Sequence, residues 1–371
     1  MKISKITPFL VDRCLLVRVY TDSGIVGTGE AGLWAHHHLV LDAINELSEY
    51  YVGKDASRME HHFQVVSRDT HFQGAVLSAA MSAIDIALWD ILGKSVDKPV
   101  HALLGGRVRE RVKVFANVIG KTPDEMARSA ESSVQKGYTS LRVIPFFEGF
   151  ECLPSTQVIG RAVDVVHVIR EAIGYEVDLG VEIHRNLSKV EIVQFGNLVA
   201  PYRLLYVEDP LAPESTDSLR YVAEHVNVPL AAGERAYNMY QFKEIIDTGA
   251  VALVRPDLSL AGGFTQVKKI AAVAESAFVG IFPHLMGSPV NLAAYVQLDA
   301  AIPNYVLMED LASGDALNEI LEEPLRRDGG YVVVPDRPGI GVDIREDRLA
   351  RFPYRPHTIS GWFREDGSVA H

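Results

Sequence analysis

The sequence has little of what several large classes of protein require. It contains two cysteines, Cys14 and Cys152, in 371 residues, too few for a disulfide framework. Its formal net charge is −12, whereas a nucleic-acid-binding protein generally presents a basic face. The N-terminal residues form no continuous apolar signal core, and no apolar run approaches the roughly 20 residues that span a bilayer. We therefore expect a cytoplasmic protein with no nucleic-acid or membrane partner.

The first third of the chain differs in pattern from the rest. LLVRVYTDSGIVGTGEA has two strand-like runs around the turn signal TDSG, which predicts an antiparallel hairpin. Residues 75–94 are apolar on most faces and predict a deeply buried helix. From about residue 113 the pattern changes. VKVFAN predicts a strand, and TPDEMARSAESSVQKG then has the Thr cap, first-turn Pro and terminal Gly of a complete helix.

Strand and helix patterns alternate over more than 200 residues, which predicts a parallel α/β sheet. Eight candidate strands fit a closed barrel, which typically takes about 250 residues. A doubly wound open sheet is the alternative, although no G-x-G-x-x-G follows the first strand. The part after about residue 325 is rich in Pro and Gly, and we expect it to pack back on the N-terminal region.

Ionisable residues end six successive predicted strands: Glu182, Glu208, Glu234, Asp257, His284 and Glu309. The first three are spaced by one strand–helix unit, so they should lie at the same height on the C-terminal, active-site face of a barrel. Three converging carboxylates repel one another unless a cation neutralises them. Oxygen-only ligands favour magnesium, whereas zinc prefers Cys and His. Capping of the following helices is the alternative, and it accounts poorly for all six.

Two histidines accompany these acids. In GVEIHRNLS, Glu182 and His184 are two residues apart at a strand end, which predicts that both side chains share one surface. Asp257 and His284 end adjacent strands, and an Asp that accepts from one imidazole nitrogen makes the other a usable general base. Two histidines on either side of a metal-bound substrate can act as base and acid. A strand running into solvent and structural histidines is the alternative.

These motifs, in this order, resemble the mandelate racemase subgroup of the enolase superfamily. They are TDSGIVGTGEA, SAIDIALWDILGK, LLGG, VEDPL, AAGER, RPDLSLAGG and FPH, and they extend over nearly the whole chain. The resemblance implies an N-terminal α+β capping domain (1–112), a modified TIM barrel of the (β/α)7β type (113–325) and a C-terminal segment (326–371) that packs on the cap. It also implies Mg²⁺-assisted abstraction of the proton α to a carboxylate. Family members are commonly multimeric, so we expect a homo-oligomer.

Within this family, the acid–x–His pattern resembles sugar-acid dehydratases of the D-galactonate dehydratase type, as do GERAYN and PHLMGSPV. That resemblance implies loss of water from a small sugar acid to give a 2-keto-3-deoxy product. The implied roles are metal ligands at Glu182, Glu208 and Glu234, a base at His284 with Asp257, an acid for the departing 3-hydroxyl at His184, and a hydrogen bond from Glu309 to the metal-bound carboxylate or enediolate.

The chain departs from the family pattern in two places. The first ligand is usually Asp, and Glu182 is one methylene longer. The Lys-x-Lys of the second barrel strand is absent, and Arg142 stands there instead. Arginine is a poor base, so Arg142 either contacts substrate or is a structural ion-pair partner. In the cap, Trp34 or His36 could contact the sugar chain, and a solvated helix start is the alternative.

Three hypotheses follow from the sequence. The main one is a Mg²⁺-dependent dehydratase of an aldonate or aldarate. The second is a racemase or epimerase of a 2-hydroxy acid that uses the same two histidines, although the missing second-strand lysine weakens a lysine-dependent racemase. The third is a sugar-acid sensor on an inactive barrel.

Overall fold

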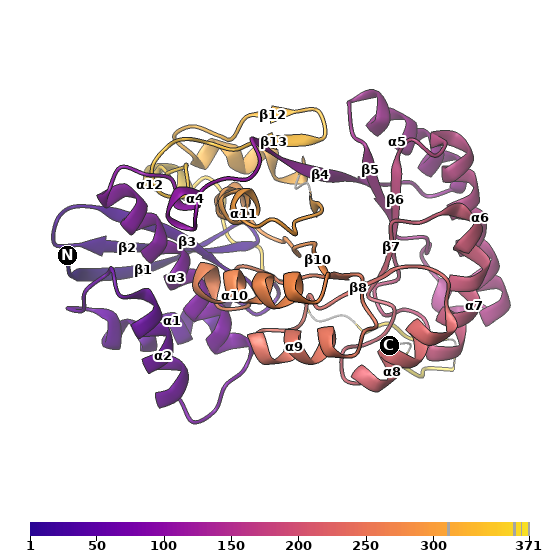
Figure 1. Ribbon diagram of the computed structural model, residues 1–371, viewed down its shortest axis with the longest axis horizontal. Helices are drawn as coiled ribbons and strands as arrows, with labels where there is room; N and C mark the ends of the chain where they lie inside the picture. The colour runs from indigo at the N-terminus through magenta and orange to yellow at the C-terminus, as the bar shows by residue number, and fades with distance from the viewer. Residues whose placement is uncertain (310–311, 359–360, 365, 370–371) are drawn as a thin grey trace.

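The computed structural model describes residues 1–309, 312–358, 361–364 and 366–369 (Figure 1). Its N-terminal part is a three-stranded antiparallel sheet with helices packed on it, at the left of Figure 1. The predicted hairpin is confirmed as the antiparallel pair of β2 and β3. The elements are β1 (Ile3–Val11), β2 (Cys14–Thr21), β3 (Val26–Ala31), α1 (His37–Tyr51), α2 (Met59–Asp69), α3 (Ala75–Ser95) and α4 (Val100–Leu103).

Helix α3 is the buried helix that the sequence predicts, and it packs tightly against β3. A Cβ atom at Gly27 or Gly29 would overlap the carbonyl oxygens of Ala87 and Ala83, so the strand touches the helix backbone directly. By length and composition α3 could cross a membrane, which shows that the expectation of no such stretch was wrong. However, 67% of its apolar window is buried inside the fold, as in the core helix of a globular protein.

Parallel strands alternating with helices form the next part of the described chain. In the sheet, β4 to β10 lie in sequence order, β11 pairs with β4, and a parallel bridge between Ile281 and Tyr305 closes the ring. This confirms the (β/α)7β barrel. The strands are β4 (Arg111–Val118), β5 (Ser140–Val143), β6 (Asp178–Glu182), β7 (Tyr206–Glu208), β8 (Leu230–Ala232), β9 (Leu253–Val254), β10 (Gly280–Ile281) and β11 (Met308–Glu309).

Seven helices connect these strands and cover the barrel. Their starts follow from local sequence: Thr122 accepts the backbone N–H of Glu125 to cap α5, and Ser188 and Glu191 form a reciprocal capping box on α7. The helices are α5 (Pro123–Gln135), α6 (Ser155–Ile173), α7 (Lys189–Val199), α8 (Thr216–His225), α9 (Met239–Asp247), α10 (Gly263–Ser276) and α11 (Pro289–Ala301), with short 3-10 turns η1 (Phe150–Cys152) and η2 (Ala200–Tyr202).

Side-chain alternation along the strands sets the contents of the barrel. An apolar cluster fills its lower interior: Phe115, Tyr206, Ala231, Leu253, Phe282 and Leu307. Because alternate residues of a strand point to the same side, the next inward position after each is two residues further on. At the ends of β7 and β11, and just beyond the ends of β9 and β10, that position carries an ionisable group, namely Glu208, Glu309, Arg255 and His284. The barrel therefore changes from apolar to charged towards its C-terminal mouth.

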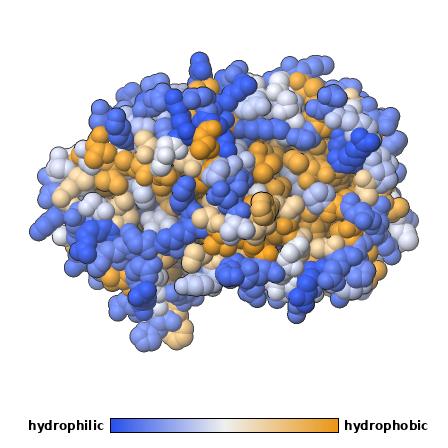
Figure 2. All heavy atoms as spheres, in the orientation of Figure 1, coloured by the Kyte–Doolittle hydropathy of each residue, from blue (hydrophilic) through white to orange (hydrophobic). Residues whose placement is uncertain are grey.

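The C-terminal part extends the barrel sheet and then returns to the N-terminal part. It contains η3 (Ala312–Ile320), β12 (Arg327–Asp328), β13 (Tyr331–Val333) and α12 (Glu346–Leu349), with β13 antiparallel to β4. Lys94 of α3 lies 2.9 Å from Asp343, and Arg18 of β2 lies 3.0 Å from Glu346. Figure 2 shows apolar residues gathered over the barrel, right of centre, with hydrophilic residues around most of this face.

Candidate active site

Three glutamates converge at the C-terminal ends of neighbouring strands. Glu182 ends β6, Glu208 ends β7 and Glu234 follows β8, and each offers a carboxylate oxygen within 4.8 Å of the other two. Glu208 is fully buried, Glu182 is buried, and the Glu234 side chain is 11% exposed. Buried carboxylates without nearby positive charge are costly, so the surroundings of this triad decide what it can do.

Glu234 reaches the triad because the chain turns at Gly233. Inward positions on β8 fall at Ala231 and then at residue 233, so simple alternation would direct residue 234 outwards. Gly233 has a φ of 120°, in the region that glycine favours, and a Cβ there would lie 2.9 Å from the Phe242 ring. The glycine in AAGER therefore redirects the backbone and turns the third carboxylate to the mouth.

Two buried arginines lie against these acids. The Arg142 guanidinium is 3.2 Å from both Glu182 and Glu208 and 2.6 Å from Glu309. Arg255 is fully buried, 2.9 Å from Glu208 and 3.9 Å from Glu234 and Glu309. Arg142 thus makes the ion pairs that were one of its two predicted roles. We call the four glutamates 182, 208, 234 and 309 the mouth cluster.

The charges of the mouth cluster fit a divalent cation. These four glutamates and the neighbouring Asp209 face three guanidinium groups, those of Arg142, Arg255 and Arg185, which leaves two formal negative charges uncompensated. The donors are all carboxylate oxygens, the ligands that Mg²⁺ prefers. The residues present therefore suit Mg²⁺, with Glu182, Glu208 and Glu234 as the residues that would hold it.

Excess negative charge also changes the protonation of neighbouring acids. Burial raises the pKa of Glu208 to about 7, although Arg255 and Arg142 oppose this. Burial and the charge of Glu234 raise the pKa of Asp209 to about 8, against the opposing charge of Arg185. Arg185 also forms ion pairs with Asp209 and with Glu234, at 2.6 Å for the latter. The triad thus lies in a network in which acids outnumber arginines.

His284 and Asp257 form the predicted pair. His284 Nδ1 lies 2.7 Å from Asp257 Oδ2, and its Nε2 lies 3.8 Å from Glu234. Asp257 Oδ1 accepts hydrogen bonds from the Ser259 hydroxyl at 2.6 Å and the Tyr295 hydroxyl at 2.7 Å. Burial lowers the pKa of His284, but Glu234 and Asp257 outweigh it and raise the pKa to about 9. A cation beside Glu234 opposes this effect.

His184 lies two residues after the end of β6 and interacts with Glu234. Its predicted place on an extended strand is wrong: β6 ends at Glu182, and His184 and Arg185 have φ values of 51° and 65°. Such left-handed backbone in non-glycine residues is strained and is often found at functional sites. Burial and Arg185 lower the pKa of His184 to about 4, while Glu234 acts in the opposite direction. The two imidazoles therefore have pKa values shifted in opposite directions.

The two candidate substrate residues of the cap lie apart from this centre. Trp34 is 49% exposed and makes an edge contact with the His357 ring, and His36 is exposed. Among the described residues, no hydrogen bond or ion pair joins either to the mouth cluster. They occupy the loop that follows β3, and their predicted role stays a prediction.

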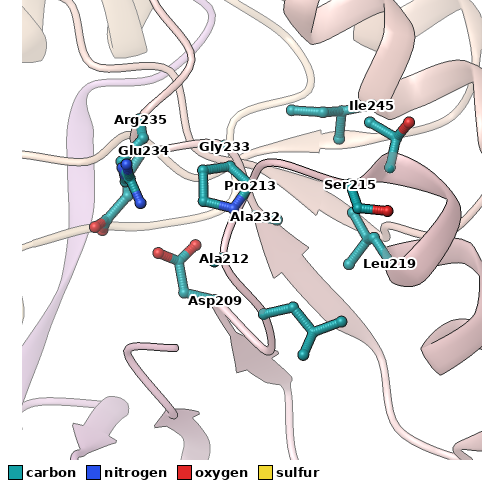
Figure 3. A pocket seen from close by; sticks show the side chains of 12 residues that line it. Asp209, Ala212, Pro213, Ser215, Leu219, Ala232, Gly233, Glu234, Arg235 and Ile245 are labelled. Carbon is teal, nitrogen blue, oxygen red and sulfur yellow. The ribbon is translucent and has the colours of Figure 1, made fainter. Parts of the chain in front are cut away.

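A small cavity of about 30 Å³ lies behind the strand ends, next to Asp209 and Glu234. Figure 3 shows these two carboxylates together on one side of it, with Ser215 and Leu219 on the other. This volume holds about one water molecule and no sugar acid. This cavity is therefore not a place for a sugar acid.

Sequence reasoning assigned no role to Arg255, Arg185, Ser259 or Tyr295. Arg255 had a readable signal, because it precedes Asp257 by two residues and alternation places both on the inner face. Ser259 also had a local signal, because it lies two residues after Asp257 and its backbone N–H and hydroxyl both donate to that carboxylate. Tyr295 had none, since its contact with Asp257 depends on how α11 packs against the loop after β9.

Comparison with known proteins agrees with this geometry. The family described as mandelate racemase / muconate lactonizing enzyme, N-terminal domain, matches residues 5–105, and enolase C-terminal domain-like matches residues 125–348. D-galactonate dehydratases from Variovorax paradoxus and Xanthomonas oryzae are 34% and 35% identical, and both alignments cover 100% of each chain.

Solved structures show the same fold. An enolase from Agrobacterium radiobacter, bound to sodium and L-malate, is 28% identical with a TM-score of 0.93, covering 100% of this chain and 99% of its own. A member of the enolase superfamily from Salmonella Typhimurium is 28% identical with a TM-score of 0.91, covering 95% and 98%. The chain therefore belongs to the enolase superfamily, in the group of mandelate racemase and muconate lactonizing enzyme.

Proposed function

We propose that this protein dehydrates a small sugar acid, an aldonate of the D-galactonate type or an aldarate, with Mg²⁺ as its cofactor. The enzyme class follows from the relatives of this chain. The protein is a sugar-acid dehydratase, a hydro-lyase, because several curated relatives of full length at 33–35% identity are dehydratases of one sugar acid. The substrate, the metal and the roles of individual residues are the proposal.

One observation supports the mechanism: three glutamates that could hold a metal ion lie near two histidines, one of which is paired with Asp257. When bound, Mg²⁺ supplies positive charge that stabilises the charge developing on the substrate carboxylate during proton abstraction. His284 Nε2 takes the C2 proton, while Asp257 holds Nδ1 and fixes the orientation of the ring. Glu309, whose orientation Arg142 fixes, has to carry a proton in order to donate a hydrogen bond to the substrate carboxylate.

His184 completes the reaction at the neighbouring carbon. The C2–H electron pair forms a C2–C3 double bond, the C3–O bond breaks, and His184 gives a proton to the departing hydroxyl, which leaves as water. The resulting enol converts to the 2-keto-3-deoxy acid. Burial and Arg185 disfavour a charged His184, and an anionic substrate adds the negative charge that opposes them. Arg142 is fully engaged with glutamates, so the missing second-strand lysine is replaced by a structural cation.

A screen of C5 and C6 aldonates and aldarates with Mg²⁺ tests the proposal, with 2-keto-3-deoxy products detected by semicarbazide. We expect turnover with at least one compound. With that compound in D2O, H284N should lose both product formation and deuterium exchange at C2, whereas H184N should lose product formation and keep exchange. Exchange at C2 by the wild type without any keto product would instead support the racemase or epimerase alternative.

We also propose that the protein acts as a cytoplasmic homo-oligomer on its small-molecule substrate, without nucleic-acid or membrane partners. The oligomeric state is read directly by light scattering of the purified protein.

A further inference from the structure

The end of β3, in the capping part, touches the barrel next to both members of the His284–Asp257 pair. Glu30 is 1% exposed, and Oε1 accepts the backbone N–H of Ser288 at 2.8 Å. Its Oε2 accepts the Ser288 hydroxyl at 2.5 Å and the backbone N–H of Asn291 at 3.2 Å. Ser288 caps α11 and lies four residues after His284. A cap carboxylate therefore holds the segment that carries one imidazole.

Asn291 continues this contact towards the other member of the pair. Its Nδ2 donates to Ser259 Oγ at 3.2 Å and to the carbonyl of Met286 at 3.3 Å. Ser259 Oγ in turn donates to Asp257 Oδ1 at 2.6 Å. A continuous series of hydrogen bonds thus runs from Glu30 through Asn291 and Ser259 to Asp257.

A second contact from the same strand end supports the first. The backbone N–H of Gly32 donates to the carbonyl of Ser259 at 2.8 Å, and a Cβ at Gly32 would lie 2.9 Å from Ser259 Oγ. Gly287 approaches Glu30 so closely that a Cβ there would overlap Oε1. Neither place has room for a side chain, so the cap strand and the two barrel segments have one mutual arrangement.

We propose that Glu30 is a positioning residue, which fixes the His284–Asp257 pair relative to the capping domain through Ser288, Asn291 and Ser259. This inference rests on the proposed function for its kinetic consequences. The described partners of Glu30 are Ser288, Asn291 and Cys14, and none of them belongs to the mouth cluster. The effect of Glu30 is on the orientation of the base, because small misplacements of a catalytic group cost large factors in rate.

The chain offers a matched control in Asp85. This acid of α3 is also buried in the contact between cap and barrel, and it accepts the backbone N–H of Thr265 at 3.1 Å and the Thr265 hydroxyl at 2.5 Å. It therefore binds the first turn of α10 much as Glu30 binds α11. Among the described contacts of Asp85 and Thr265, none continues to Asp257 or His284.

The experiment compares E30Q with D85N in the Mg²⁺-loaded enzyme. Either orientation of a Gln amide at position 30 leaves one backbone N–H of Ser288 or Asn291 without its acceptor. We expect kcat of E30Q to fall about 10- to 100-fold with KM within about twofold. We expect D85N to lose thermal stability while kcat stays within about twofold. Equal kcat for E30Q and D85N would overturn the positioning role.

Crystal structures of the wild type and E30Q give a readout that needs no substrate. We expect the contact of 2.7 Å between His284 Nδ1 and Asp257 Oδ2 to lengthen or rotate in E30Q. An unchanged pair would overturn the inference, even if no sugar acid were turned over and the proposed function had failed. If E30Q does not fold, N291A removes the same connection from the barrel side, and the same changes in kcat and in the pair are expected.

Discussion

Two groups of buried acids differ in how their charge is compensated. The mouth cluster, together with Asp209, faces three guanidinium groups and retains two formal negative charges. Glu30 and Asp85, which we call the seam acids, receive hydrogen bonds from the backbone and hydroxyl groups of helix starts. A buried acid can adopt its neutral form where a neighbouring hydroxyl group can accept a hydrogen bond from it. A cluster of charged carboxylates instead needs a cation nearby. We propose that the mouth cluster binds a metal ion, whereas the seam acids join the capping part to the barrel.

The largest expected difference is in activity after loss of one carboxylate. E234Q removes a proposed metal ligand that lies 3.8 Å from His284, and we expect activity to fall at least about a thousandfold. Mg²⁺ affinity, measured by calorimetry, should fall together with it, and chelation of Mg²⁺ from the wild type should have the same effect on activity. D85N is the matched control, and it should bind Mg²⁺ like the wild type. Undiminished Mg²⁺ binding by E234Q would remove the distinction between the two groups.

The next largest effect should be a loss of stability when an arginine that pairs with the mouth cluster is replaced. Arg255 is fully buried among the glutamates, so R255M leaves buried negative charge without its partner. Breaking a buried ion pair from one side typically costs about 3–5 kcal/mol. We expect a loss of this size in the free energy of unfolding, measured by urea denaturation without metal. The exposed pair of Arg220 and Asp217 provides a control, and R220M should leave the unfolding free energy nearly unchanged.

A seam acid should also affect the pH dependence of stability. Burial raises the pKa of Asp85 from 3.8 to about 7, so the protonated form favours folding. This contribution is present below about pH 4 and is lost as the pH rises through 7, about 4 kcal/mol in total. Asn cannot ionise, so D85N should lose less stability than the wild type between pH 5 and pH 8. Parallel denaturation curves at the two pH values measure this, and equal losses in both proteins would contradict the shift.

The smallest effect is expected in the loop that follows β3. Trp34 is half exposed and lies apart from the mouth cluster, so W34A should leave kcat nearly unchanged. If the loop contacts the sugar chain, KM should rise several-fold, to about tenfold at most, since one aromatic contact contributes about 1 kcal/mol. H36A tests the other candidate in the same assay. Unchanged KM in both variants would remove the two residues from the substrate site.

Most of the fold and of the mouth cluster could be predicted because both follow from local periodicity. Strand–helix alternation gave the barrel, and predicted strand ends gave the glutamates. Asp257 and His284 were also predicted to end strands, but β9 and β10 end three residues before them. The prediction was wrong where the backbone leaves regular geometry, as at His184. Resemblance to a family added the cap and the roles that remain proposals.

The seam could not be predicted, because nothing local indicates a partner so far along the chain. Glu30 binds Ser288 and Asn291, which are 258 and 261 residues away. In the sequence, Glu30 is an acid within a strand that reads as part of a hairpin, and an exposed position would be the ordinary expectation. Only the packing of β3 between α3 and α11 gives it a role.

Gly27 and Gly29 set the distance between β3 and α3, since neither leaves room for a methyl group. An alanine at either position would force the strand away from the helix and move Glu30 with it. Inherited or engineered variants at these glycines should therefore resemble active-site variants in their kinetics, although they lie on the opposite face of the strand from Glu30. The capping domain is then not interchangeable between relatives. In a chimera that joins this barrel to another member's cap, the spacing between strand and helix in that cap would change the orientation of His284.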